Sequence, residues 1–136
     1  MKYKGHSGAD LVLHDKTTNT LFVGDLVFNK RAPSTAHAKN LENWIEELTE
    51  LATIDFDVLV PGHGPVSLDL SAINTTKKHL MWLDKLFLES SKNGDDINEV
   101  MEVKIPAELK GNALSKYELS RSAVHFYHQY EERLFE

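Results

Sequence analysis

The chain has 136 residues and a mass of 15.4 kDa, and its 15 basic and 21 acidic side chains give a formal net charge of −6. This length predicts a single domain over residues 1–136, and 41% hydrophobic with 26% charged residues excludes a disordered tail or a fibre. The excess of acidic side chains argues against a nucleic-acid partner, and the absence of cysteine excludes disulfides. No apolar run approaches the roughly 18–20 residues that a membrane span needs.

The first expected elements are two strands joined by a turn. Residues 9–14 and 20–24 are short and rich in Leu and Val, and the intervening residues 15–19 (DKTTN) have turn chemistry. We therefore predict a β-hairpin. The polar stretch 29–39 that follows contains Pro33, which favours a loop.

A helix and a third strand follow the hairpin. Asn40 can cap a helix, and apolar residues recur after it at three- and four-residue spacings: Leu41, Trp44, Ile45, Leu48, Leu51 and Ala52. Residues 57–60 (DVLV) form a short apolar run that ends in P-G-H-G-P, as expected of a buried strand followed by a tight loop. The order strand, helix, strand predicts a right-handed βαβ unit in which residues 20–24 and 57–60 run parallel.

The rest of the chain is expected to be helical. Apolar spacing predicts a long helix over residues 69–92, and a short helix should follow Asp95 or Asp96 and end before Pro106. Ser115 and Glu118 have the spacing of a capping box at the start of a last helix. Residues 1–68 thus hold the strands, one helix and the motifs described next, and residues 69–136 are mostly helical.

Three possible metal ligands converge in this predicted fold. His6 precedes the first strand, Asp25 ends the second, and His63 ends the parallel third strand. The hairpin and the parallel pairing bring all three to one end of the sheet, where open α/β folds place their sites. Glycines beside each residue (G-H-S-G, G-D and P-G-H-G-P) permit unusual backbone angles and close approach.

Two imidazoles and a carboxylate form a ligand set that suits one or two Zn²⁺ ions and would also accept Fe or Mn. Asp25 is the expected catalytic residue, because a carboxylate can bridge two metals and orient the water between them. Each motif alone also fits a turn or a helix cap, and only their common location favours a metal site. We interpret the other histidines as solvated or structural: His14, His37, His79, His125 and His128.

These motifs carry a family resemblance. G-H-S-G (5–8), L-F-V-G-D-L-V-F (21–28) and V-L-V-P-G-H-G-P-V (58–66) resemble the C-terminal half of a metallo-β-lactamase-fold hydrolase. The sequences around them, and R-S-A-V-H-F-Y-H-Q-Y-E-E near the end, are similar to zinc metallohydrolases associated with quinoprotein systems. The resemblance implies half of an αβ/βα sandwich, with His6 on the first metal, Asp25 bridging two metals and His63 on the second.

The sequence departs from this family in one respect. It has no H-x-H-x-D-H motif, which in such enzymes supplies most of the remaining ligands. Since catalytic zinc normally has three protein ligands and a water, we expect this chain to bind metal weakly and to be inactive or weakly active alone. The resemblance thus implies a truncated chain or one partner of a split enzyme, whose small-molecule substrate the sequence does not identify.

Half of a sandwich would leave one face of its sheet without cover. Leu11, Leu13 and Phe22 or their neighbours should form an exposed apolar patch, which predicts a homodimer or a complex with a missing N-terminal half. Two functions remain open: a metal-dependent hydrolase of an ester, thioester or amide, and a non-catalytic, self-associating half-domain with vestigial ligands. The first 12 residues lack the apolar core of a signal peptide. Because the enzymes that this sequence resembles are often exported, the sequence does not determine the compartment.

Overall fold

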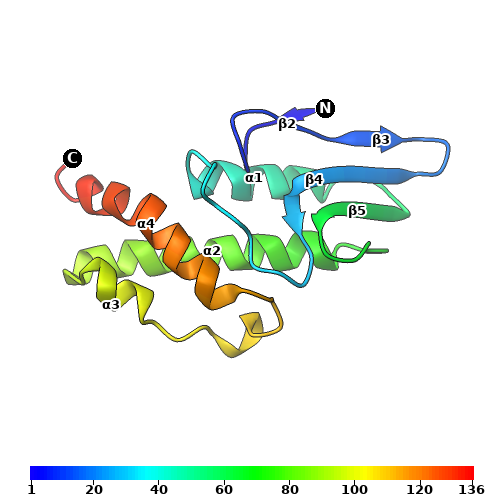
Figure 1. The fold of residues 1–136 in the computed structure, drawn as a ribbon. Helices are drawn as coiled ribbons and strands as arrows, with labels where there is room; N and C mark the ends of the chain where they lie inside the picture. The colour runs from blue at the N-terminus through cyan, green and yellow to red at the C-terminus, as the bar shows by residue number, and fades with distance from the viewer.

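A small sheet and a layer of helices make up the fold in the computed structural model, which describes all residues 1–136 (Figure 1). The strands are β1 (Lys2–Tyr3), β2 (Asp10–Leu11), β3 (Leu13–Asp15), β4 (Thr20–Phe28) and β5 (Val58–His63). The helices are α1 (Leu41–Leu51), α2 (Ser71–Asn93), α3 (Ile97–Met101), the 3₁₀ turn Ala107–Leu109 and α4 (Ser115–Arg133). This mixed α/β architecture confirms the predicted fold class. None of the helices combines the length and apolarity that crossing a lipid bilayer requires.

The predicted hairpin and βαβ unit are both present. Strands β3 and β4 pair antiparallel, with Leu13 opposite Phe22, and β4 pairs parallel with β5 in the sheet order β3-β4-β5. Residues 9–14 do not form the single strand that we expected. They divide at the buried Val12 into β2, which pairs with β1, and β3.

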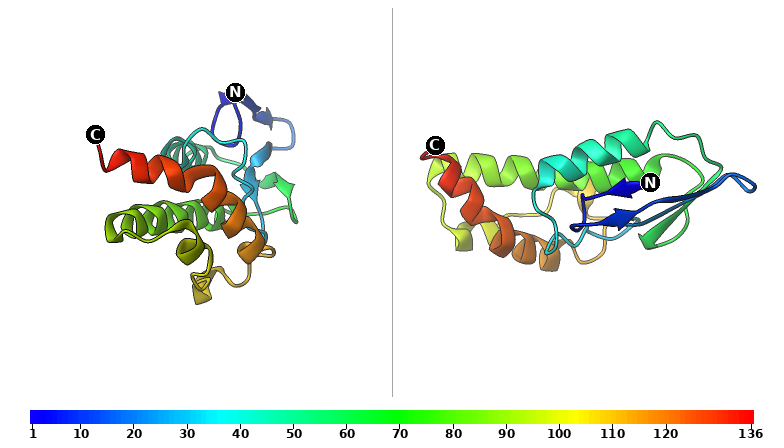
Figure 2. Two further views of the ribbon diagram at one scale, coloured as in Figure 1. Left: turned by 60° about the vertical axis from the view of Figure 1, so that its left-hand side comes forward. Right: turned by 90° about the horizontal axis from the view of Figure 1, so that it is seen from above.

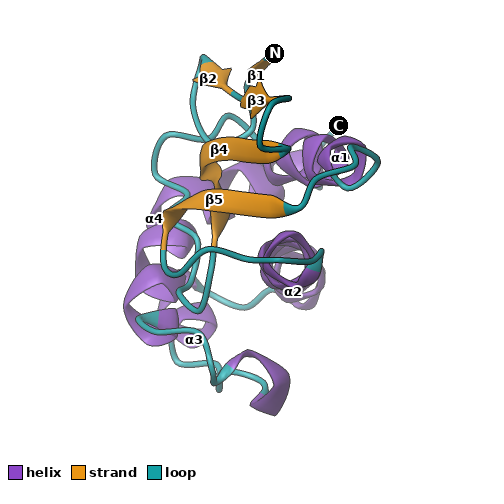
Figure 3. Ribbon diagram, turned by 90° about the vertical axis from the view of Figure 1, so that its right-hand side faces the viewer, coloured by secondary structure: helices purple, strands orange, loops and turns teal.

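Helices α1 and α2 cover one face of the sheet (Figure 3). Asn40 caps α1 as predicted, because its side chain accepts a hydrogen bond from the Asn43 N–H at 2.8 Å. The Trp44 indole Nε1 donates to the backbone carbonyl of Leu26 at 3.0 Å, which holds α1 against β4. Leu21, Val23 and Leu59 fill the space between this sheet face and the helices.

The long helix α2 runs below the sheet in the view of Figure 1, and α4 crosses it (Figures 1 and 2). It binds the end of β4 through Thr76, whose Oγ1 accepts from the Phe28 N–H at 3.1 Å and lies 3.0 Å from the Phe28 carbonyl oxygen. Helix α4 crosses α2 and packs Phe126, Tyr127 and Tyr130 into the core. The short helix α3 begins at Asp96, whose carboxylate accepts from the Glu99 N–H.

The predicted capping box of α4 is wrong. The residue before the helix is Leu114, in the left-handed region with φ 62°, and no side chain caps the first turn. Ser115 Oγ instead donates to the Asn112 carbonyl at 2.8 Å. Glu118 is buried and turns toward two arginines, with Oε1 2.8 Å from Arg121 Nη1 and Oε2 3.9 Å from Arg31 Nη1. The Glu118 carboxylate therefore pairs with two guanidinium groups, whereas in a capping box it would accept a hydrogen bond from a backbone N–H at the start of the helix.

The predicted exposed apolar side chains lie on the β3-β4 hairpin and on β2, which belongs to the separate two-stranded sheet β1-β2. Leu11 is 72% exposed, Leu13 65% and Phe22 41%. These three residues lie on the strands away from α1 and α2, and we call them the open sheet face. Apolar side chains gathered on one face are typical of a surface that meets a partner.

Candidate metal centre

His6, Asp25 and His63 lie together, although 57 residues separate the first from the last in the sequence. His6 Nε2 is 3.9 Å from Asp25 Oδ2, and His63 Nε2 is 3.5 Å from Asp25 Oδ1. The Asp25 and His63 side chains are 42% and 45% exposed, whereas His6 is 11% exposed. Asp25 thus stands between two imidazoles, with a different carboxylate oxygen turned to each.

A bend in β4 brings Asp25 to this position. Gly24 has a φ of 55°, in the left-handed region, and the pairing register between β4 and β5 shifts on both sides of it. Beyond the bend, Leu26, Val27 and Phe28 are all buried, so the strand turns into the core after presenting Asp25 (Figure 1). The G-D pair is therefore the point at which the strand is redirected.

The P-G-H-G-P loop brings β5 against Asp25. A Cβ at Gly62 would lie 2.0 Å from Asp25 Oδ1, and one at Gly64, where φ is 89°, would lie 1.8 Å from the Asn29 carbonyl oxygen. Only glycine fits at these two positions. The Asn29 N–H donates to the His63 carbonyl at 2.9 Å, and the His63 ring stacks on Phe28 with centroids 4.7 Å apart.

His6 lies in the loop between β1 and β2, beside α1. Asp10 shapes this loop, since its Oδ2 accepts the N–H groups of His6 and Ser7 at 3.1 and 3.0 Å. The Trp44 ring packs edge-on against the imidazole at a centroid distance of 5.4 Å. Burial lowers the pKa of His6 below its ordinary value, although the Asp25 and Asp10 carboxylates act to raise it. A lowered pKa keeps the imidazole neutral, the form that binds metal.

The donor set fits two metal positions that share Asp25 better than one. In a tetrahedral zinc site with bonds of ~2.0–2.2 Å, neighbouring donor atoms lie roughly 3.3–3.6 Å apart. The separation of 3.5 Å between His63 and Asp25 falls in this range, and that of 3.9 Å between His6 and Asp25 is slightly longer. The two histidines face different oxygens of Asp25, as they would if the carboxylate bridged two ions. No group of three or more His, Cys, Asp or Glu side chains is arranged to hold a single ion. Each position thus has two donors from this chain, one fewer than catalytic zinc normally takes.

The centre opens into a shallow cavity of about 500 Å³. Its lining includes His6, Asp25 and Leu11, the most exposed residue of the open sheet face. The accessible side of the centre and the open sheet face are therefore continuous. Anything that covered Leu11 would also approach His6 and Asp25.

The structure places one further histidine beside the centre. The His37 ring lies 6.2 Å from the His6 ring, edge to face, although the sequence interpretation treated His37 only as a solvated loop residue. Its side chain is exposed, so the solvation was correctly expected and the neighbour was missed. No local pattern marks this proximity, because it depends on how the loop at 29–39 folds back.

The remaining histidines lie in separate local contacts. His14 pairs with Asn19, His125 with the Ala38 carbonyl and His128 with Glu132. His79 is buried in α2, where burial lowers its pKa to about 4. The interpretation of these four as solvated or structural agrees with the contacts that they make.

A bent strand, a glycine-framed loop and a His–Asp–His cluster at one end of a partly parallel sheet define an α/β protein with a candidate metal centre. The family model of the metallo-beta-lactamase superfamily matches residues 4–63, the segment that contains all three residues. A comparison with curated protein sequences gave no significant match.

Two solved structures are similar to this chain. A double mutant of the sec-alkyl sulfatase PisA1 superimposes with a TM-score of 0.62 and 17% identity, covering 97% of this chain and 24% of that one. A metallo-beta-lactamase family protein from Thermus thermophilus gives a TM-score of 0.54 and 17% identity, covering 95% of this chain and 42% of that one. The chain thus spans less than half the length of either protein. These likenesses show that the chain has a partial form of the metallo-β-lactamase fold, and residues 4–63 resemble that superfamily in sequence.

Proposed function

We propose that this chain supplies one side of a two-metal hydrolytic centre. His6 and Asp25 Oδ2 would bind one divalent metal, and His63 and Asp25 Oδ1 the other. The observation that carries the proposal is the placement of the two imidazoles at 3.9 and 3.5 Å from different oxygens of one carboxylate. Zinc suits this N/O set best, and Fe or Mn would also fit.

Two bound metals would supply an activated water for attack on an ester, thioester or amide. The chain's own contribution is to fix the bridging group. Gly62 and Gly24 bring Asp25 to the centre, and Phe28 orients the His63 ring by stacking. The name of one structural neighbour, a sec-alkyl sulfatase, adds sulfate esters to the substrates that merit testing.

Further donors would come from outside these 136 residues. Each metal position has two donors here, and no other cluster of His, Cys, Asp or Glu offers more. The open sheet face continues into the cavity at the centre, so one partner could cover the apolar side chains and complete the metal shells. We propose that this partner is a second copy of the chain or a polypeptide equivalent to the N-terminal half of the family fold. Alone, the chain should hydrolyse substrates slowly or not at all.

The alternative is a non-catalytic half-domain that self-associates through the open sheet face and keeps the three residues as relics. Exposed Leu11, Leu13 and Phe22 favour association in either case. Only metal binding separates the two functions.

Equilibrium dialysis of the purified chain against zinc provides the test. Because each position has only two donors, wild type should bind two equivalents of zinc weakly but saturably, and His63→Ala should bind only one, because one of the two donors at its position is lost. His14→Ala is the matched control, since His14 contacts Asn19 on the hairpin away from the centre. Absence of zinc from wild type even after reconstitution would favour the non-catalytic half-domain.

A further inference from the structure

A groove of about 480 Å³ lies between the loop at 29–39 and helix α4. Ala36 forms its loop side, and Ser120, Arg121, Val124 and His125 line it from α4. Its lining contains the cation Arg121, the imidazole of His125 and no acidic side chain, although the chain as a whole carries a net charge of −6. Local charge therefore favours an anionic occupant.

Arg121 has unused hydrogen-bonding capacity in this groove. Its Nη1 donates to Glu118 Oε1 at 2.8 Å and to Ser34 Oγ at 3.3 Å, whereas Nε and Nη2 make no hydrogen bond within the chain. The planar guanidinium can thus still present N–H groups to a carboxylate, sulfate or phosphate oxygen. Its side chain is 39% exposed, so a ligand can reach it.

The charge of Arg121 is not fully neutralised by its protein partner. The buried Glu118 carboxylate is shared, since Arg31 Nη1 lies 3.9 Å from its other oxygen. The single negative charge of Glu118 therefore lies near the positive charges of both Arg31 and Arg121. Arg31 also lies over the Phe28 ring at 5.4 Å, and the Phe28 ring stacks on His63, so this positive surplus borders the metal centre.

A fixed turn separates the groove from the metal centre. The Ala38 N–H donates to the Thr35 carbonyl at 3.0 Å and closes a turn over Ala36 and His37. Both ends are anchored on α4, through the buried pair Thr35 Oγ1 and Ser122 Oγ at 2.7 Å and through His125 Nε2, which donates to the Ala38 carbonyl at 2.8 Å. Ala36 lines the groove while the next residue, His37, lies beside His6.

We propose that this groove binds an oxyanion group of the substrate, with Arg121 as its principal anchor. Ala36 and Val124 would contact an apolar part of the same molecule, and His37 would lie between the bound group and the metals. The substrate class is then an ester or amide that carries a carboxylate, sulfate or phosphate group. This assignment of substrate rests on the proposed function, but the binding of anions to the groove does not.

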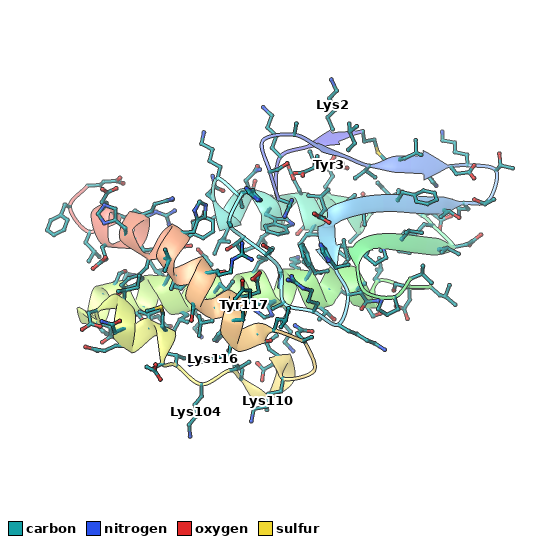
Figure 4. The ribbon with its side chains drawn as sticks, in the orientation of Figure 1. Lys2, Tyr3, Lys104, Lys110, Lys116 and Tyr117 are labelled. Atoms are coloured by element: carbon teal, nitrogen blue, oxygen red, sulfur yellow. The ribbon has the colours of Figure 1, made fainter.

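A second basic cleft offers an internal comparison. A cavity of about 450 Å³ is lined by residues that include Lys104, Lys110 and Lys116, at the lower edge of the view in Figure 4. Lys116 Nζ already donates to the Met101 carbonyl at 2.6 Å, and Glu102 also lines this cleft. Glu102 partly neutralises the positive charge of this cleft, and Lys116 already donates a hydrogen bond within the protein. The cleft should therefore bind small anions less well than the groove does.

NMR titration of the metal-free chain with butyrate, butyl sulfate and uncharged butyramide tests the proposal. Butyrate or butyl sulfate should shift the amide signals of residues 34–37 and 120–125, with saturation, and the tighter of the two identifies the anion class. Butyramide should not saturate these signals. Arg121→Gln should weaken binding about tenfold or more, the usual effect of losing a charged hydrogen bond. Arg133→Gln is the matched control, because Arg133 on the same helix pairs with Glu42 at 2.9 Å.

A second pair of variants avoids any folding defect caused by exposing Glu118. Val124 is 70% exposed, so Val124→Glu and Val124→Gln should both fold, and they differ only in charge. The glutamate variant should bind the anions several-fold more weakly than the glutamine variant. The proposal is overturned if the anions bind equally to both, if they shift the lysine cleft instead, or if neither binds. Because no metal is present, these results are independent of the zinc experiment.

Discussion

At the scale of single residues, Gly62 lies so close to Asp25 that no side chain fits there. A Cβ at Gly62 would lie 2.0 Å from Asp25 Oδ1 and 2.7 Å from the carbonyl carbon of Gly24. Gly62→Ala should therefore displace the Asp25 carboxylate, weaken zinc binding and lower the free energy of unfolding by about 2 kcal/mol or more. Gly111→Ala is the control, because nothing lies within 4 Å of a Cβ there. Urea unfolding and zinc dialysis of both variants give the comparison, and unchanged zinc binding in Gly62→Ala would contradict this account of the loop.

His79 should make stability depend on pH. Burial lowers its pKa from 6.5 to about 4, its Nδ1 accepts from Asn112 Nδ2 at 3.0 Å, and its buried Nε2 has no partner. The unfolded chain therefore takes up a proton at this residue before the folded chain does. Its contribution to stability is complete above pH 6.5 and decreases as the pH falls to about 4, by about 3 kcal/mol in total.

His79→Gln isolates this effect, because glutamine can accept from Asn112 but cannot be protonated. Urea unfolding of wild type and variant across pH 4–7 should show a stability difference that shrinks or reverses toward low pH. A difference that is constant over this range would show that His79 does not titrate as described.

At the scale of elements, the start of α4 provides a test of what Glu118 does. A capping box predicts that Glu118→Gln is almost neutral, since glutamine can also bond to the backbone. The observed contacts with Arg31 and Arg121 predict instead a loss of about 1–3 kcal/mol, because two guanidinium groups lose their shared carboxylate. Glu132→Gln, in an exposed pair with His128, should change stability by less than about 0.5 kcal/mol. Equal stability of the Glu118 variant and wild type would favour the cap.

The sequence predicts elements well where their signal is local. The hairpin, the Asn40 cap, the βαβ unit and the meeting of His6, Asp25 and His63 all follow from periodicity, turn residues and parallel pairing. The sequence does not predict the contact of Glu118 with Arg31, because Arg31 lies 87 residues earlier in the chain. His37 was missed for the same reason, since its place beside His6 depends on contacts of the loop with α4.

At the scale of the whole molecule, the open sheet face should make the chain associate. Leu11, Leu13 and Phe22 are exposed, and Leu11 lines the cavity at the candidate centre. Sedimentation velocity should show concentration-dependent association of wild type that the double variant Leu13→Ser, Phe22→Ser removes. Met81→Ser is the control, because Met81 is 52% exposed on α2, away from the sheet face. A wild-type chain that stays monomeric at its highest soluble concentration would argue against a second copy as the partner.

The most direct test of the shared metal centre is a spectroscopic titration with Co²⁺, which reports ligand number through its absorption. We predict that wild type binds two ions and that His6→Ala and His63→Ala each lose one of them. Asp25→Asn should weaken both, because each position takes one of the two Asp25 oxygens. An Asp25→Asn variant that keeps both ions, or histidine variants that bind cobalt as wild type does, would contradict the account.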